Sequence, residues 1–487
     1  MSPTSIILTL AGYITLLFIV AWLAARNRGG GISFFTGGRN THRIVAAIAM
    51  VGAAMSGVTY ISVPGSVAND GFSYLQTTLG FFFGYVVIAY MLIPLYYRLG
   101  VVSLYEYLDQ RFGIVAHRTG AWLFFLAKIM AASLRAFAVC AVLQPLLFER
   151  YDLPFVLNAV AMMLLVWLYT RRGGVRSVVW VEMLKTLIMV GSIVLCISFV
   201  IESLDINIVE AIGAIADSHY SDTLFFDDVL DRRYFFKQFV AGIFLVVAMT
   251  GLDQDMMQTA LSCRSAGDAQ RSLMHSIVIQ MIVIVLFLAL GALLYIFIDS
   301  RGLVVERGDE LFGFVATECG LPVVVGILFL LGLVASTYSS AGSALTALTT
   351  TFTLDILRAR ERYREEQLSG VRKVVHALIA MAMVAIICAF YQWSSAGAIT
   401  LIFTIASYTY GPLLGMFAFG LLTQRQVHGK AIPVIALLSP TISYIVASNS
   451  EAWLGGYSFS YEVLILNAGL CFVALWLCSH NETSKKS

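Results

Sequence analysis

Charged residues are scarce in this sequence. Of its 487 residues, only 12% are Asp, Glu, Lys or Arg, whereas 59% are hydrophobic. A soluble domain carries about 25% charged residues, so this chain has too little polar surface to cover a globule that faces water. Its formal net charge is +2, which provides no overall field to attract nucleic acid. The composition therefore excludes an ordinary soluble domain and gives no reason to expect a nucleic-acid partner.

The sequence also lacks a disulfide framework and a catalytic motif. Its seven cysteines lie mostly inside apolar runs, where buried thiols act as small hydrophobic residues. It has no HExxH or GxSxG motif, and His275 and His376 are isolated near the starts of apolar runs. We therefore expect a protein that is not an enzyme. Only seven residues follow His480, so we also expect no fused signalling domain.

Long apolar runs are what the sequence has in abundance. Runs of about twenty residues, each long enough to cross a hydrocarbon layer about 30 Å thick, recur from Ile6 to Cys478. Only helices and closed barrels satisfy their backbone groups in lipid, and barrel strands are shorter and alternate in polarity. We therefore predict an all-α membrane protein with about 13 transmembrane helices. The predicted spans are residues 6–25, 44–67, 75–97, 120–148, 154–169, 178–201, 235–259, 273–298, 322–354, 374–390, 399–422, 432–447 and 463–478.

The segments between these spans alternate in Lys and Arg content. One set holds 22 of the 31 Lys and Arg residues, and the opposite set holds six. The positive-inside rule places the richer set in the cytoplasm. We therefore predict a multi-pass protein of the cell membrane, in a bacterium the inner membrane, with its N-terminus outside and its C-terminus cytoplasmic. The richer set comprises Arg26, Arg28, Arg39, Arg43, Arg98, Arg111, Arg118, Arg171, Arg172, Arg176, Arg264, Arg271, the six in 358–373, Arg425, Lys430, Lys485 and Lys486.

Three basic residues remain inside predicted spans: Lys128, Arg135 and Lys185. Charges within a membrane are costly, and they usually face the bundle interior or a water-filled cavity. We therefore treat these three as functional leads. Span 235–259 ends in the polar segment TGLDQDMMQ, and we expect its Asp253 and Asp255 to lie near the cytoplasmic mouth.

Span 44–67 carries residues that weaken a helix, with hydroxyls beside them. A helix broken near the midplane frees backbone carbonyls that can coordinate a cation. Small residues also permit close helix packing, and composition alone leaves both interpretations open. The weakening residues are Gly52, Gly57, Pro64 and Gly65, and the hydroxyls are those of Ser56, Thr59 and Ser62.

Span 322–354 carries a row of serines at helical spacing. Ser336, Ser339, Ser340 and Ser343 are three, four and seven residues apart, which places them on one face. Hydroxyl oxygens are hard, neutral ligands that suit a small, weakly bound cation. They could instead form hydrogen bonds between helices, which is the commoner role of such residues.

Several segments together resemble the sodium:solute symporter family, which includes bacterial galactose, proline and sialic-acid carriers. The matching segments are FFTGGR (34–39), SGVTYISVPG (56–65), SLYEYLDQRFG (103–113), YTRRGGVRSVVWVE (169–182), GLDQDMMQ (251–258) and the serine-rich span that ends in Asp355. The resemblance implies a leucine-transporter-type fold with a 5+5 inverted repeat. The whole chain, 1–487, would be one transmembrane transporter domain: a leading helix at 6–25, a first repeat at 44–201, a second at 235–422 and two trailing helices at 432–478.

The resemblance also implies a sodium site between the broken first core helix and the eighth core helix. By position, its ligands here would be the backbone carbonyls of Gly52, Met55 and Ser336 and the hydroxyls of Ser339 and Ser340. This set agrees with the oxygen-ligand argument from spacing. Sodium is accordingly the expected coupling ion.

Some relatives have a second sodium site, and it looks incomplete here. That site needs two more hydroxyls and an Asp, but the corresponding residues are Gly342, Ser343 and Glu182. Because Gly342 has no side-chain oxygen, we predict one sodium per solute and treat Glu182 and Ser343 as a vestigial second site. Glu182 could instead form an ion pair with Lys185 three residues on.

The resemblance places the solute at the midplane beside the broken helices. Arg135 is the main candidate, because a guanidinium donates two parallel hydrogen bonds to a carboxylate. Sialic-acid carriers use an Arg on this helix, but an ungapped register puts Ala131 there and Arg135 one turn further along. Both substrate contact and a bridge between helices therefore stay open. The substrate-binding candidates are Ser56, Thr59, Tyr74, Thr78, Arg135, Thr250 and Asp253, with Tyr74 as an outer lid or an interface anchor.

We therefore expect a secondary active transporter that brings a small organic solute into the cell together with sodium by alternating access. An anionic sugar or another carboxylate is the first expectation for the solute, and a neutral sugar is the second. A passive channel and a membrane-embedded sensor are the alternatives from other classes. Accumulation against a gradient, driven by sodium, would distinguish a symporter from a channel.

Overall fold

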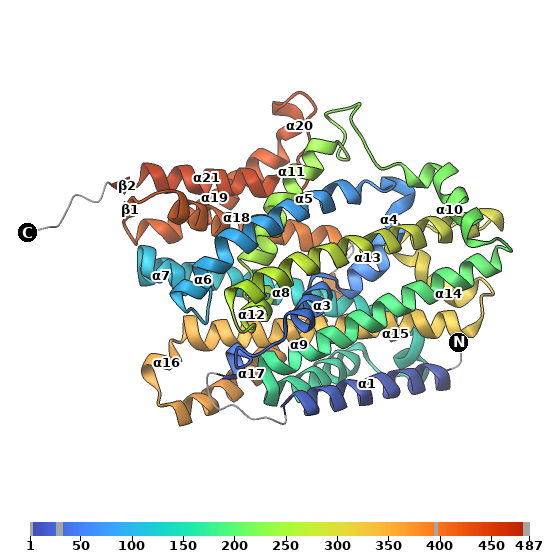
Figure 1. The fold of residues 1–487 in the computed structure, drawn as a ribbon, viewed down its shortest axis with the longest axis horizontal. Helices are drawn as coiled ribbons and strands as arrows, with labels where there is room; N and C mark the ends of the chain where they lie inside the picture. Colours follow the sequence, from blue (N-terminus) through green and yellow to red (C-terminus); the bar gives the residue numbers. More distant parts are fainter. Residues whose placement is uncertain (1–2, 26–32, 394–397, 481–487) are drawn as a thin grey trace, which may run out of the picture.

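The computed structural model describes residues 3–25, 33–393 and 398–480. Most of its long helices run along the longest axis of the molecule (Figure 1). A helix satisfies its own backbone hydrogen bonds, which is why apolar runs adopt this structure in lipid. Within the described residues, eight helices are each long and apolar enough to cross a membrane, and ten if each bent pair is one span. The all-α prediction is confirmed, and each predicted span overlaps a helix, while the number of crossings stays a prediction.

The described residues up to Ser203 form the first series of helices. Helices α3 and α4 are the two arms of one bent span, and α5 continues into α6 through a π-helical turn at Ile88–Leu92. Helix α9 is kinked at Gly174, whose φ of 51° favours glycine, so its two arms cover the predicted spans 154–169 and 178–201. The bounds are α1 Pro3–Ala25, α2 Ser33–Thr36, α3 Arg43–Ala54, α4 Gly57–Asp70, α5 Tyr74–Val87, α6 Ile93–Leu99, α7 Glu106–Phe112, α8 Ile114–Leu143 and α9 Phe155–Ser203.

Residues 208–480 form the second series, which also contains a bent pair, α11 and α12. Helix α11 reaches this bend through a π-helical turn at Val247–Gly251. The bounds are α10 Ile208–Asp217, α11 Phe235–Val246, α12 Gln254–Leu261, α13 Ala266–Ser300, α14 Leu311–Glu318, α15 Val323–Thr351, α16 Ala359–Arg362, α17 Glu365–Trp393, α18 Ala398–Leu422, α19 Ala431–Ser448, α20 Ser450–Trp453 and α21 Val463–Leu477. Each of the two expected repeats therefore opens on a bent helix pair.

The segment 202–234 and a short strand pair lie outside the predicted spans, as do the short helices α2, α7, α14, α16 and α20. The segment 202–234 contains α10, whose first turn is capped by the side chain of Asn207 and by Glu210. Strand β1, Gln426–Val427, pairs with β2, Ser479–His480, and ties the end of α18 to the end of α21. Four basic residues used to predict the orientation, Arg26, Arg28, Lys485 and Lys486, lie outside the described residues.

The centre of the bundle is built around α9 and α15. Helix α15 packs against α9, α8 and α4, and α3 packs against α9 and α13. The second half of α15 is buried on every side, from Val334 to Thr351, although it carries seven Ser and Thr side chains beyond Ser336 and Thr337. The bent pairs and this hydroxyl-rich helix therefore meet in the interior, which is where the candidate site lies.

Candidate functional site

The first bend separates α3 from α4 at Met55 and Ser56. The two helices differ in direction by 63°, so the predicted interruption of span 44–67 is confirmed. Ser56 begins α4 as its N-cap: its Oγ accepts from the Thr59 backbone N–H at 3.5 Å, and the Thr59 hydroxyl accepts from the Ser56 N–H at 3.3 Å. These two hydroxyls stabilise the start of the second arm.

Small residues at this bend let it approach its neighbours closely. A Cβ on Gly57 would lie 2.3 Å from the Thr337 hydroxyl of α15. A Cβ on Gly52 would lie 2.5 Å from the Thr186 hydroxyl and 2.7 Å from the Glu182 carbonyl of α9. The packing interpretation of these glycines and the broken-helix interpretation therefore both hold.

The second bend separates α11 from α12 by 68°. Asp253 is the N-cap of α12, and its Oδ1 accepts from the backbone N–H groups of Asp255 at 2.8 Å and Met256 at 3.4 Å. Asp253 and Asp255 are buried, at 3% and 4% exposure, and their expected place near the cytoplasmic mouth stays a prediction. The helix stops at Asp253 in the interior, and the carboxylate is buried as its cap.

A buried lysine pairs with both of these carboxylates. The Lys128 Nζ of α8 lies 3.0 Å from Asp253 Oδ2 and 2.7 Å from Asp255 Oδ2. The Tyr410 hydroxyl of α18 also donates to Asp253 Oδ2, at 2.5 Å. This cluster joins α8, α12 and α18, and it satisfies the requirement that a charge inside the membrane has a partner.

A second buried lysine lies between the bend of α3 and the serine face of α15. Lys185 pairs with Glu182 on its own helix at 3.2 Å, which is the alternative that their spacing left open, and neither side chain is exposed. The Lys185 Nζ also donates to the Gly52 carbonyl at 2.5 Å and to the Ser340 hydroxyl at 2.9 Å. The segments expected to share a sodium ion are therefore side by side.

The other expected sodium ligands lie in the same region. The Ser340 hydroxyl donates to the Ser336 carbonyl at 2.7 Å, and Met55 is the C-cap of α3. The Ser339 Oγ is buried with no well-formed hydrogen bond among the described residues, although it lies near the Glu182 carboxylate. Their role as ligands stays a prediction.

The residues of the second site have other partners. The Ser343 hydroxyl donates to Asp255 Oδ2 at 3.3 Å and to the Ser340 carbonyl at 3.1 Å. A Cβ on Gly342 would lie 1.5 Å from the Tyr169 hydroxyl, which donates to the Tyr338 carbonyl at 3.0 Å. Tyr169 thus occupies the space that a side chain at position 342 would need.

Of the three basic residues inside the predicted spans, Arg135 alone has no hydrogen-bond or ion-pair partner in the described part of the chain. It is half-buried on α8, and its Nε is buried without a hydrogen bond. It lies within range of a charge interaction with Lys128, Lys185 and the Tyr410 hydroxyl. A guanidinium in this position is available for an anionic ligand.

The remaining substrate candidates divide into two groups. Thr250 is buried in the turn before the second bend and lies near the Tyr85 hydroxyl. Tyr74 and Thr78 lie at the start of α5, where the Thr78 hydroxyl donates to the Tyr74 carbonyl at 2.8 Å. In the described residues, no hydrogen bond, ion pair or ring contact joins Tyr74 or Thr78 to Arg135 or to either bend.

A further polar cluster, which no local sequence pattern indicates, lies where α7, α8 and the end of α15 meet. His117 lies 3.2 Å from Asp109 Oδ2 and 2.8 Å from Asp355 Oδ1, and the Ser103 hydroxyl donates to Asp355 Oδ2 at 2.7 Å. Asp355 belongs to a matched segment, but its partner is 238 residues away. No local signal could have found this pair.

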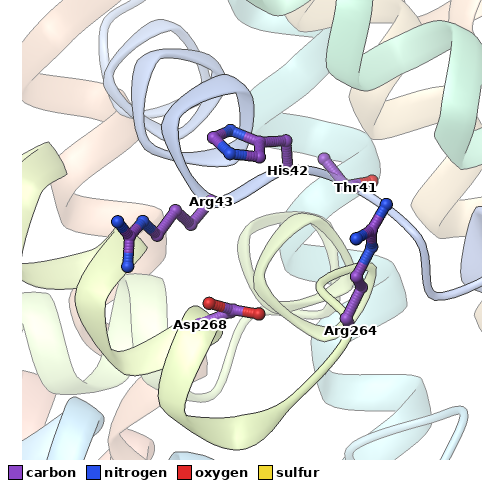
Figure 2. Close-up of a pocket in the computed structure, with 5 residues that line it drawn as sticks. All are labelled: Thr41, His42, Arg43, Arg264 and Asp268. Atoms are coloured by element: carbon purple, nitrogen blue, oxygen red, sulfur yellow. The ribbon is translucent and has the colours of Figure 1, made fainter.

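A surface pocket of about 190 Å³ lies at the beginning of α3. Figure 2 shows its lining, in which Arg43 and Arg264 flank Asp268, with Thr41 and His42 beside them. Because the 12 residues of α3 separate it from the bend, at 1.5 Å per residue it lies about 18 Å from Met55. It is therefore distinct from the candidate site.

Comparison with known proteins identifies the family to which the chain is similar. A profile of the sodium:solute symporter family matches residues 34–432. The human sodium/iodide cotransporter is 25% identical over 81% of this chain, the Xenopus laevis sodium-coupled monocarboxylate transporter 1 is 24% identical over 87%, and the Proteus mirabilis (strain HI4320) sodium/sialic acid symporter is 22% identical over 90%. The matched regions cover 62%, 66% and 88% of those relatives' own lengths.

A solved structure has the same fold. It is the substrate-bound outward-open state of a Na+-coupled sialic acid symporter, with a TM-score of 0.82 and 19% identity over 97% of both chains. The expected leucine-transporter-type fold is thereby confirmed. On the family profile, which covers most of its length, this chain belongs to the sodium:solute symporter family.

Proposed function

We propose that this chain is a secondary active transporter that moves a small organic solute into the cell together with sodium. The observation that carries the proposal is the meeting of the α3 bend with the serine face of α15, through Gly52 and Ser340. Neutral oxygens freed at a helix break can hold a coupling ion inside a membrane. Membership of the family and the sodium-coupled relatives support the same function.

One sodium ion per solute is the proposed stoichiometry. Its ligands are the carbonyls of Gly52, Met55 and Ser336 and the hydroxyls of Ser339 and Ser340. The buried Ser339 Oγ supports this set, because it has no well-formed hydrogen bond among the described residues and an unsatisfied hydroxyl in a dry interior is costly. The expected second site lacks one hydroxyl, because Gly342 offers no side-chain oxygen and Tyr169 lies against it.

The charges around the bends favour an anionic solute. The buried and half-buried cations are Lys128, Lys185 and Arg135, and the buried carboxylates are Asp253, Asp255 and Glu182. Their formal charges cancel, so one sodium ion and one carboxylate bound together leave the region neutral. Uncompensated charge is expensive in such surroundings.

Arg135 is the proposed carboxylate-binding residue, because its guanidinium has no protein partner in the described chain. Ser56, Thr59, Thr250 and Asp253 lie at the two bends and are proposed to line the remaining polar side of the solute site. Tyr74 and Thr78 are proposed as its outer lid. Two relatives are named for carboxylate solutes, sialic acid and monocarboxylates, which agrees with an anionic sugar or another carboxylate.

Uptake into proteoliposomes tests the function. With an inward sodium gradient, sialic acid or a short monocarboxylate should accumulate above its external concentration, and replacement of sodium by choline should abolish this accumulation. The ratio of sodium to solute should be one. Uptake that is unaffected by choline, or flux that only equilibrates the solute, would contradict the proposal, and accumulation of neutral sugars alone would contradict the carboxylate assignment.

Thermal unfolding of the purified protein gives a second readout. A ligand that binds the native state stabilises it by RT ln(1+[L]/Kd), so sodium and solute together should raise the unfolding temperature more than either alone. Because coupling between two ligands is reciprocal, sodium should tighten solute binding by the same factor that solute tightens sodium binding. Independent, additive shifts would argue against coupled transport.

A further inference from the structure

The ammonium group of Lys185 occupies the space between the expected sodium ligands. Its Nζ lies 2.5 Å from the Gly52 carbonyl oxygen of α3, 2.9 Å from the Ser340 Oγ of α15 and 3.2 Å from Glu182 Oε2 of α9. Of these three oxygens, those of Gly52 and Ser340 accept hydrogen bonds from the ammonium, and Glu182 Oε2 is its ion-pair partner. The Lys185 side chain is fully buried.

The orientation of Ser340 shows that this lysine uses the lone pairs that a metal ion would use. The Ser340 hydroxyl hydrogen is directed to the Ser336 carbonyl at 2.7 Å, so its oxygen faces Lys185 as an acceptor. The Gly52 carbonyl accepts from the same ammonium. A sodium ion bound to Gly52 and Ser340 would therefore meet a like charge at hydrogen-bonding distance, which is strongly unfavourable in a low dielectric.

Two carboxylates near Lys185 provide a second place for its ammonium. Glu182 Oε1 and Asp255 Oδ1 are buried and accept no hydrogen bond in the described part of the chain. Asp255 lies within range of a charge interaction with Lys185, and Arg135 is the other charged group that faces it. A change in the side-chain torsions of Lys185 could move its ammonium from Gly52 and Ser340 towards these oxygens, which would open the oxygen cage.

We propose that Lys185 is a tethered competitor of the coupling ion, whose ammonium holds the Gly52–Ser340 cage and must leave it before sodium binds there. This inference rests on the proposed sodium symport and adds a residue that sets the apparent sodium affinity. Without sodium in the cage, the ammonium links α3 to α15. With sodium bound, it is held by Glu182 and Asp255.

Competition of this kind weakens the measured affinity by a predictable factor. When only a fraction of molecules has an open site, the apparent Kd is the intrinsic Kd divided by that fraction. If Lys185 leaves the cage in about one molecule in ten, its removal should tighten sodium binding about tenfold.

The test is the binding of radiolabelled sodium to purified Lys185→Met protein, with sodium-dependent thermal shift as a parallel readout. Because this substitution leaves Glu182 without its partner, the double variant Lys185→Met/Glu182→Gln provides a second case in which no buried charge is left unpaired. Both variants should bind sodium about tenfold more tightly than the parent protein.

Lys237→Met is the matched control. Lys237 is also buried, at 8% exposure, and donates to the Leu230 carbonyl at 3.3 Å, but it lies at the start of α11, outside the cage. Its removal should leave the sodium affinity unchanged.

Three outcomes decide the inference. Tighter sodium binding in the Lys185 variants but not in Lys237→Met supports it. Parent protein that transports without sodium, together with sodium binding that emerges only in the Lys185 variants, also supports it while overturning the proposed sodium coupling. Unchanged or weaker sodium binding in both folded Lys185 variants would overturn the inference and leave the proposed symport intact.

Discussion

The three basic residues inside the predicted spans have different surroundings, and these surroundings separate their roles. Lys128 pairs with Asp253 and Asp255, and Lys185 pairs with Glu182. A buried ion pair contributes little net stability, but loss of one partner is costly because the other charge remains. Arg135 has no such partner in the described residues, and its proposed role as the carboxylate-binding residue rests on this difference.

Substitution of Arg135 by Gln should selectively weaken carboxylate transport. Hydrogen bonds to charged groups contribute about 1.5–3 kcal/mol, so we expect the KM for the carboxylate to rise by about tenfold to a hundredfold. Sodium binding, followed by thermal shift, should persist. Arg135→Lys should recover transport only in part, because an ammonium lacks the two parallel donors of the guanidinium. Normal carboxylate uptake by Arg135→Gln would show that Arg135 only bridges helices.

Gly342→Ser should destabilise the protein rather than complete a second sodium site. The new Cβ would lie 1.5 Å from the Tyr169 hydroxyl and 2.4 Å from its Cζ, and overpacking of this kind costs about 1–3 kcal/mol or more. We expect a lower unfolding temperature for Gly342→Ser. The double variant Gly342→Ser/Tyr169→Phe, which removes the nearest clashing atom and keeps the ring, should recover part of the loss. A single variant as stable as the parent would contradict this account of Tyr169.

At the scale of elements, the same residues break α3 from α4 and bring them against their neighbours. Gly52 lies against α9 and Gly57 lies against α15. A larger residue at either position would push the bend away from the helices that complete the cage. Backbone oxygens at the bend are therefore placed by helix packing as much as by the interruption itself.

Gly52→Ala should lower sodium affinity. The added methyl would meet Thr186 Oγ1 at 2.5 Å and the Glu182 carbonyl at 2.7 Å, so α3 must shift away from α9 and carry the Gly52 carbonyl with it. We expect sodium binding to weaken by about tenfold or more, which corresponds to about 1.4 kcal/mol.

Gly191→Ala on α9 is the control for this prediction, because no heavy atom lies within 4 Å of its added Cβ. Sodium titrations of the two variants by thermal shift make the comparison. Equal sodium affinities in Gly52→Ala and Gly191→Ala would show that the position of the Gly52 carbonyl does not matter.

At the scale of the whole molecule, the chain begins and ends on opposite sides of the bundle. Helix α1 starts at the right of Figure 1, and β2 lies at the left. An odd number of crossings produces this arrangement, and the distribution of Lys and Arg predicts which side is the cytoplasm. The orientation itself stays a prediction from this rule and can be tested with a native thiol.

Cys478 should react with a membrane-impermeant maleimide only from the cytoplasmic side. It is exposed at the end of α21, whereas Cys140, Cys196 and Cys263 are buried. We expect labelling in inside-out vesicles and none in intact cells, and Cys478→Ser should abolish it. Labelling of intact cells that is lost in Cys478→Ser would reverse the predicted orientation.

The sequence alone determined the helices and the interruption between Gly52 and Gly57. Lipid requires every spanning segment to satisfy its own backbone, so apolar length and helix-weakening residues are sufficient local signals. The sequence also predicts the serine face of α15, because helical spacing places Ser336, Ser339 and Ser340 on one side of the helix. The sequence does not predict the second bend, because a polar residue such as Asp253 is typical of the end of a helix. In the structure Asp253 is instead the N-cap of the buried helix α12.

Which groups pair in the interior depends on how distant segments of the chain fold together. Lys128 meets Asp253 across 125 residues, His117 meets Asp355 across 238, and Lys185 meets Gly52 across 133. Local spacing predicts only neighbours three or four residues apart on one helix, such as Glu182 and Lys185. Contacts between distant segments depend on how whole helices pack, and this packing is what placed an ammonium where the sequence led us to expect a sodium ion.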